Sequence, residues 1–226
     1  MLGMDLNDLL FVISYAAIPA VFAITLHEVA HGWAAKQLGD PTAFQLGRLS
    51  ANPIRHIDPL GTIIVPIGLA VLSNGATTFG WAKPVPVVFA NLRNPKRDMI
   101  LVAAAGPGAN LVMATFWALF AMALFGAGLS DSGFGGWLIL SCAAGIAFNV
   151  LLMVFNLLPI PPLDGGRVLA GLLPKAGSDF LARIEPFGFI IVLVLVFGPG
   201  QILWNILEPF LRFFLDFFYS AAGLRN

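Results

Sequence analysis

Long apolar segments without charged side chains constrain this sequence more than any other feature. A helix needs about 20 apolar residues to cross a hydrocarbon core of about 30 Å, and residues 9–26 contain no charged side chain at all. Only 11% of the residues are charged, whereas soluble globular domains have about 25%. We therefore expect an integral membrane protein.

Five apolar segments divide the chain into predicted helices. Three of them are long and continuous enough for complete membrane spans, at about residues 9–37, 99–128 and 136–158. The segment 59–82 is broken by proline and glycine and predicts a short or re-entrant span. The segment 186–219 predicts a helical pair that crosses the bilayer fully or only in part. The expected fold is an all-α polytopic membrane protein, a helical bundle of about 4–6 membrane segments.

A single transmembrane domain is expected for the whole chain, 1–226, with a core at about 9–175 and a C-terminal helical pair at about 184–222. Two connections, 43–61 and 79–92, contain prolines, turn residues and β-branched residues, which predict short β or extended segments. Backbone of this kind is tolerated at membrane depth only where it is buried in protein or lines a wet cavity.

The basic residues predict the orientation of the chain in its membrane. Lys and Arg are concentrated in 36–55, 83–97 and 167–183, whereas the loop 127–135 has none. Because cytoplasmic loops carry an excess of Lys and Arg, we expect the N-terminus outside and the C-terminal end of the first span at the cytosolic face. The acidic N-terminus lacks the basic region of a cleavable signal peptide.

Charge and cysteine content exclude two other classes of protein. The net charge is zero and no basic cluster is present, so nucleic acid is not an expected partner. Cys142 is the only cysteine, so an internal disulfide is not possible, and its apolar surroundings predict a small buried residue.

A polar motif, HEVAH, ends the first apolar run. His27 and His31 are four residues apart, so on a helix both rings project from one face about one turn apart, where they can bind one Zn²⁺ ion. Glu28 lies about 100° round the helix, near such an ion but not aligned with both histidines. That is the position of a general base that takes a proton from water.

A catalytic zinc site usually has three protein ligands and one open position. Asp164 directly follows the fourth span in NLLPIPPLDGG, where Gly165 and Gly166 allow the backbone to approach a partner closely. A carboxylate there would complete a set of two histidines and one carboxylate. The alternatives are that Asp164 caps a helix beginning near Arg167, or that His56 is the third ligand.

These motifs together resemble the site-two protease family of intramembrane zinc metalloproteases, in particular compact prokaryotic members without a PDZ domain. The resemblance covers about residues 9–175 and rests on HEVAH (27–31) followed by NLLPIPPLDGG (156–166). GPGAN (106–110) and NPIRHIDPLGT (52–62) are also similar to stretches found in that family.

The resemblance implies that His27, His31 and Asp164 bind one zinc ion per chain, that Glu28 activates water, and that Asn156 helps to bind or polarise the substrate. Asn149 lies seven residues before Asn156 and therefore on the same helix face. An amide there can donate to a peptide carbonyl or to a developing oxyanion.

The roles of the other polar residues are left open by the sequence. Asn149 and Asn110 are expected mainly to hydrogen-bond between helices, with contact to substrate as the alternative for Asn149. His56 is a candidate for contact with substrate or with Asp58, and an interfacial position is its alternative. The segment 79–90 is a candidate edge to which an extended substrate adds as a strand.

The expected function is that of an intramembrane zinc metalloprotease that hydrolyses peptide bonds in or near transmembrane segments of membrane-protein substrates. Its expected partners are a transmembrane protein or peptide substrate and the lipid bilayer, and its expected location is the cell (inner) membrane, as a multi-pass protein whose active site lies towards the cytosol. The alternative is a zinc-binding membrane protein or transporter without proteolytic activity. A transporter should carry further ligands along a path, yet the chain has only three histidines and one cysteine.

Overall fold

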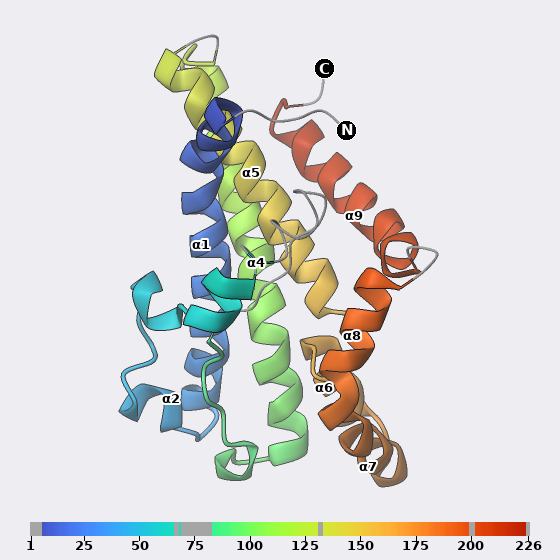
Figure 1. The fold of residues 1–226 in the computed structure, drawn as a ribbon. Coiled ribbons are helices and arrows are strands. Elements are labelled where there is room, and N and C mark those ends of the chain that lie inside the picture. Colours follow the sequence, from blue (N-terminus) through green and yellow to red (C-terminus); the bar gives the residue numbers. More distant parts are fainter. Residues whose placement is uncertain (1–5, 66–67, 69–82, 131–132, 199–201, 225–226) are drawn as a thin grey trace.

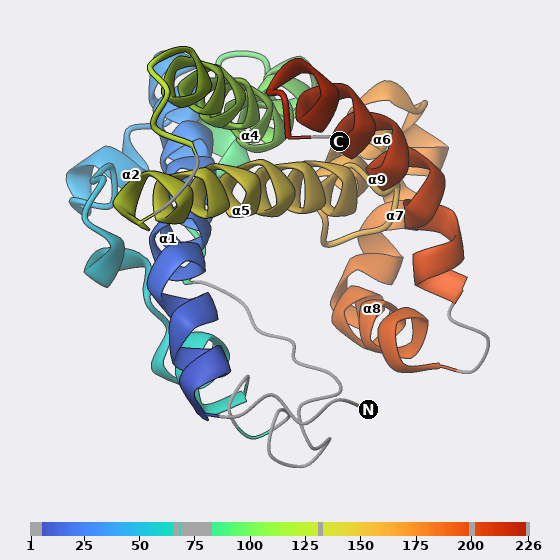
Figure 2. The same ribbon diagram turned by 90° about the horizontal axis from the view of Figure 1, so that it is seen from above.

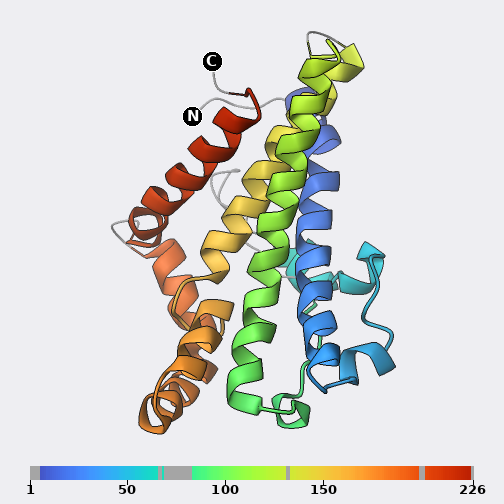
Figure 3. The ribbon, with the colours of Figure 1, turned by 180° about the vertical axis from the view of Figure 1, so that it is seen from behind.

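Three long helices lie side by side and form the centre of the molecule. The computed structural model describes residues 6–65, 68, 83–130, 133–198 and 202–224. Helices α1 (Leu6–Gln37), α4 (Pro95–Gly126) and α5 (Gly133–Asn156) pack against one another, with α4 running opposite to the other two (Figures 1 and 3). The predicted helical bundle is therefore confirmed.

Four shorter helices follow the bundle along the chain. They are α6 (Asp164–Leu172), α7 (Lys175–Ile184), α8 (Gly188–Phe197) and α9 (Ile202–Ala221). Helix α6 packs on α4, and α9 packs on α5. Seen from above, α8 and α9 lie on the opposite side of the bundle from the short helix α2 (Figure 2). The predicted C-terminal helical pair corresponds to α8 and α9.

Four helical segments of the described chain are long and apolar enough to cross a membrane. Three of them, Asn7–Gln37, Pro95–Gly126 and Gly133–Asn156, correspond to the three predicted spans. The fourth, Lys175–Phe197, begins before the predicted start at residue 186 because it includes α7. The chain is an all-α polytopic membrane protein.

The connection 43–61 is wrongly predicted as extended, because its prolines begin helical turns. It contains part of α2 (Thr42–Gln45), the 3₁₀ turn η1 (Pro53–His56) and the start of the π-helical turn η2 (Pro59–Ile64). The residue before each of these prolines, Asn52 or Asp58, accepts hydrogen bonds from the backbone N–H groups that open the turn. A capping side chain followed by proline is a helix start rather than a strand edge.

The second connection remains non-helical where it is described. Residues 83–88 form neither helix nor strand, Val88 is extended with φ −102° and ψ 95°, and the 3₁₀ turn η3 (Phe89–Asn91) follows. No strand occurs anywhere in the part of the chain that the structure describes. Of the predicted apolar segment 59–82, all but 59–65 and 68 lies outside the described residues, as do residues 79–82 of the predicted substrate edge.

Small residues allow α4 and α5 to approach closely. Ala114, Ala118 and Ala121 of α4 are buried in one cluster with Ile146 and Val150 of α5. Small side chains at a helix interface let the backbones pack tightly, which is how helices associate where water supplies no hydrophobic force. This close contact positions the polar residues of α4 between α1 and α5.

The C-terminal end of α1 is fixed by a glycine turn. Gly39, with φ 116°, follows the helix, and the N–H groups of Gly39 and Asp40 donate to the carbonyls of Lys36 and Ala35. This is the hydrogen-bond pattern of a Schellman motif, which satisfies carbonyls at a helix end. The turn directs the following chain back along the bundle. The end of α1, the start of α4, α2, α6 and α7 all lie at one end of the molecule (Figure 1).

Candidate metal centre

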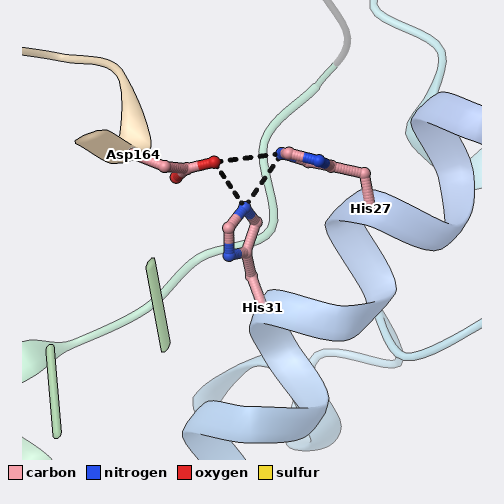
Figure 4. A group of neighbouring side chains, drawn as sticks. All are labelled: His27, His31 and Asp164. Carbon is pink, nitrogen blue, oxygen red and sulfur yellow. Dashed lines mark hydrogen bonds and ion pairs between the residues drawn. The ribbon is translucent and has the colours of Figure 1, made fainter. Parts of the chain in front are cut away.

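Two histidines and one aspartate converge between α1 and α6 (Figure 4). Their metal-ligating atoms all lie within 4.8 Å of one another. Oδ2 of Asp164 is 3.3 Å from Nε2 of both His27 and His31, and the two Nε2 atoms are 3.0 Å apart. The two rings thus project from one face of α1, as their spacing predicted.

Asp164 reaches this position because α6 starts with it. The N-cap residue of α6 is Leu163, so Asp164 is the first residue of the helix and does not cap it. Gly165 and Gly166 pack directly on the preceding turn, and a Cβ atom at Gly166 would lie only 2.6 Å from the carbonyl carbon of Ile160. The two glycines therefore permit the sharp return that carries the carboxylate to α1.

Helix α4 orients both histidine rings from the opposite side. Nδ1 of His31 lies 2.8 Å from the backbone oxygen of Val102, and Nδ1 of His27 lies 2.6 Å from Oδ1 of Asn110. A backbone carbonyl only accepts, so Nδ1 of His31 carries the hydrogen and its Nε2 has a lone pair. Metal-binding histidines nearly always donate their second ring nitrogen in this way.

Gly106 lies between these two contacts on the same face of α4. Val102, Gly106 and Asn110 are spaced by four residues, which places them one above another on a helix. A Cβ atom at Gly106 would lie 2.5 Å from Cε1 of His31 and 2.6 Å from Cε1 of His27. The missing side chain therefore provides the space in which the two rings stand.

The residues fit a divalent cation. Oδ2 of Asp164 is buried and has no hydrogen-bond partner in the described chain, and it faces the Nε2 atoms of His27 and His31. Burying unpaired polar atoms costs several kcal/mol unless something compensates, and a cation between them would do so. Two imidazole nitrogens and one carboxylate oxygen form a ligand set typical of catalytic zinc sites.

Glu28 lies beside this group and contacts another part of the chain. Its Oε2 accepts a hydrogen bond of 2.7 Å from the backbone N–H of Val85, in the non-helical segment 83–88. Among the described residues, Glu28 is not part of the cluster of ligand atoms. The segment predicted as a substrate edge therefore runs directly past Glu28, while its pairing with a substrate stays a prediction.

The other sequence candidates lie outside the ligand cluster. His56 is only 2% exposed, and its Nε2 lies 2.8 Å from the backbone oxygen of Ser50. This contact holds together the two ends of the loop between Ser50 and His56. Asn156, at the end of α5, donates to the carbonyl of Leu152, and Asn149 contacts Asn110. Contact of these side chains with a substrate stays a prediction.

Asp40 is a structural residue that the sequence did not point to. Its buried carboxylate accepts hydrogen bonds from Thr42, from the backbone N–H of Val88 and from Asn91. Burial raises the pKa of Asp40, but these hydrogen bonds outweigh burial and hold it below its ordinary value. Asp40 thereby ties the end of α1 to the segment that runs past Glu28.

Comparisons with known proteins identify the family of the chain. Residues 132–198 match the family model of peptidase family M50. The chain is 37% identical over 206 residues to "Putative zinc metalloprotease YwhC" of Bacillus subtilis, covering 86% of both chains. It is 30% identical over 193 residues to "Putative zinc metalloprotease Rip2" of Mycolicibacterium smegmatis, covering 81% of this chain and 67% of that protein. No solved structure matches the chain significantly.

Fold, site and comparisons define a polytopic membrane protein with a buried group of two histidines and one carboxylate that is similar to zinc metalloproteases. The chain belongs to peptidase family M50, the site-two protease family. The resemblance seen in the sequence motifs is thereby confirmed.

Proposed function

We propose that this chain forms a single transmembrane metalloprotease domain, an intramembrane zinc metalloprotease of the HExxH type that hydrolyses peptide bonds in or near transmembrane segments of membrane proteins. The observation that carries the proposal is the convergence of His27, His31 and Asp164, with the carboxylate of Glu28 one residue away on the same helix. One zinc ion held by these three side chains would act as a Lewis acid, polarising the scissile carbonyl and acidifying a water molecule.

Glu28 is assigned as the general base. It occupies the helix position next to His27, and only one of its carboxylate oxygens, Oε2, accepts a hydrogen bond among the described residues. The N–H of Val85 fixes that oxygen, which leaves Oε1 to take a proton from water and to pass it to the leaving amine.

Asn156 is assigned to the substrate. It ends α5, eight residues before Asp164, and its Nδ2 donates to the carbonyl of Leu152. In a side-chain amide one donor hydrogen remains after such a bond, and it can reach a peptide carbonyl. Asn156 would therefore orient the scissile bond near the ligand cluster.

The proposed location is the cell (inner) membrane, with the start of α1 outside and the centre towards the cytosol. The end of α1, the start of α4 and helices α6 and α7 lie at one end of the molecule (Figure 1). The basic residues of the sequence are concentrated in and beside these elements, and cytosolic ends of membrane helices carry such an excess. A substrate cut there would be a transmembrane protein or peptide.

The experiment that tests this function is Glu28→Gln, measured for cleavage of a membrane-protein substrate and for zinc content. The substitution keeps the size of the side chain and removes the base. We expect zinc to stay bound, because Glu28 is not in the ligand cluster, and cleavage to fall by about 10²–10⁴-fold.

Two other outcomes would contradict the proposal. Cleavage at the wild-type rate in Glu28→Gln would show that Glu28 is not the base. A wild-type protein that binds zinc but cleaves no membrane substrate, with or without a chelator, would favour the zinc-binding protein or transporter instead.

A further inference from the structure

A chain of two buried amides connects His27 to the interior of α5. Asn110 and Asn149 are both 0% exposed. Nδ2 of Asn149 donates to the backbone oxygen of Gly145 at 2.8 Å, and Oδ1 of Asn149 accepts from Nδ2 of Asn110 at 2.9 Å. Nδ2 of Asn110 also donates to the backbone oxygen of Ala23 at 3.2 Å, and Oδ1 of Asn110 faces Nδ1 of His27.

The direction of these hydrogen bonds is fixed by two groups that cannot reverse. The backbone oxygens of Gly145 and Ala23 only accept, so each requires an amide NH₂ group. The NH₂ group of Asn149 therefore turns to Gly145, and its Oδ1 turns to Asn110. The NH₂ group of Asn110 meets that oxygen, so Oδ1 of Asn110 is left for His27. Nδ1 of His27 must then carry the hydrogen.

The position of this hydrogen determines what His27 can do. With the hydrogen on Nδ1, the lone pair lies on Nε2, which faces His31 and Asp164. With the hydrogen on Nε2, His27 would donate to the lone pair of His31, 3.0 Å away, and would have no lone pair for a metal. The amide chain therefore determines whether Nε2 of His27 can be a metal ligand or can only donate a hydrogen bond.

We infer that Asn149, acting through Asn110, is a positioning residue that holds His27 in its metal-binding tautomer. This inference rests on the proposed metal site and adds a residue of α5 to it. It differs from direct substrate contact by Asn149, because that side chain is 0% exposed and both its Oδ1 and its Nδ2 already form hydrogen bonds inside the protein. The two helices α4 and α5 thus act together on one ring of α1.

Two substitutions of Asn149 and one control separate this role from general stability. Asn149→Leu keeps a similar volume and removes both polar atoms. Asn149→Asp, protonated in these apolar surroundings, keeps one acceptor for Asn110 and one O–H donor for Gly145. Ser141→Ala is the matched control, because Ser141 is a buried polar residue of the same helix whose hydroxyl, within the described part of the chain, donates to the carbonyl of Trp137 alone.

The measurements are zinc affinity, by competition with a chelator in detergent, and the imidazole ¹⁵N signals of His27 in zinc-free protein. We expect Asn149→Leu to weaken zinc binding about tenfold, the lower end of the loss for outer partners of metal ligands. In Asn149→Leu, the imidazole ¹⁵N signals of His27 should no longer show the pattern of a ring that carries its hydrogen on Nδ1. The zinc affinity of Asn149→Asp should stay within about threefold of that of the wild type. The zinc affinity of Ser141→Ala should equal that of the wild type.

The inference is overturned if Asn149→Leu binds zinc as tightly as the wild type with an unchanged His27 spectrum. An equal loss of affinity in Ser141→Ala would also overturn it, because the effect would then be general. A raised KM at unchanged zinc affinity would assign Asn149 to the substrate instead. A wild-type protein that binds no zinc would refute the proposed metal site itself.

Discussion

Gly106→Ala is the substitution that tests the geometry of the centre most directly. The added Cβ atom would lie 2.5 Å from Cε1 of His31 and 2.6 Å from Cε1 of His27, whereas ordinary contacts begin at 3.4 Å. Nε2 of His31 would lie closer still, so the two rings must retreat by at least about 0.8–0.9 Å, because the backbone of α4 is held between α1 and α5. Metal–ligand distances tolerate only about 0.2 Å.

The expected result is a loss of zinc affinity of at least about 100-fold, the upper end of the loss that follows when ring orientation is disturbed. The effect on folding should be small. Overpacking of this kind costs about 1–3 kcal/mol, and replacing glycine by alanine inside a helix returns about 1 kcal/mol. The free energy of unfolding should thus fall by no more than about 2 kcal/mol.

Gly108→Ala is the matched control, two residues further along α4. A Cβ atom there would meet no atom of the described residues within 4 Å, so zinc affinity should equal that of the wild type and stability should rise slightly. The assay is zinc affinity together with the Tm of each zinc-free variant in detergent. The reasoning is refuted if Gly106→Ala binds zinc within threefold of Gly108→Ala while both variants remain folded.

Three further predictions test the ligands, the orientation and the end of α1. Asp164→Ala should lose most of its zinc and His56→Ala none, measured by metal analysis; full zinc in the first variant would exclude Asp164 as a ligand. Single cysteines at Lys36 and at Ser130, in Cys142→Ala protein, should label from the cytosol and from outside respectively, and the reverse pattern would invert the proposed orientation. Asp40→Asn should unfold about 2 kcal/mol more easily than the wild type at pH 7. Since the folded pKa of Asp40 lies below its ordinary 3.8, the part of this difference that comes from the charge should be complete above pH 3.8 and be lost as the pH falls through the folded pKa; a difference that does not change in acid would refute the role of the charge.

The parts of the fold that depend on local chemistry could be predicted from the sequence. Uninterrupted apolar runs determine the membrane helices, and the four-residue spacing of His27 and His31 places both rings on one face whatever surrounds them. Two adjacent glycines after Asp164 likewise indicated a close return of the backbone. These features need no knowledge of distant residues, and the structure agrees with them.

The parts that depend on packing between distant segments could not be predicted. Gly106 is 75 residues from His31 in the sequence, and nothing in GPGAN says which helix its bare face meets. The hydrogen bond between Val85 and Glu28 depends on the path of a connection that has no regular secondary structure, and no periodic sequence pattern predicts such a path. The pattern of 43–61 predicts extended backbone where η1 and the start of η2 form, because Asn52 and Asp58 act as caps before proline.

The arrangement of polar groups around the centre is itself an argument for a bound cation. In an apolar bundle each unpaired polar atom costs several kcal/mol, and here the outward-facing atoms are paired. Nδ1 of His31 donates to Val102, Nδ1 of His27 donates to Asn110, and Asn110 is in turn held by Asn149. Only the inward-facing atoms, two Nε2 lone pairs and one carboxylate oxygen, are left facing one another. Apolar side chains at these positions would make the protein interior at least as stable. The free-energy cost of burying these polar atoms is therefore explained by the ion that they can bind.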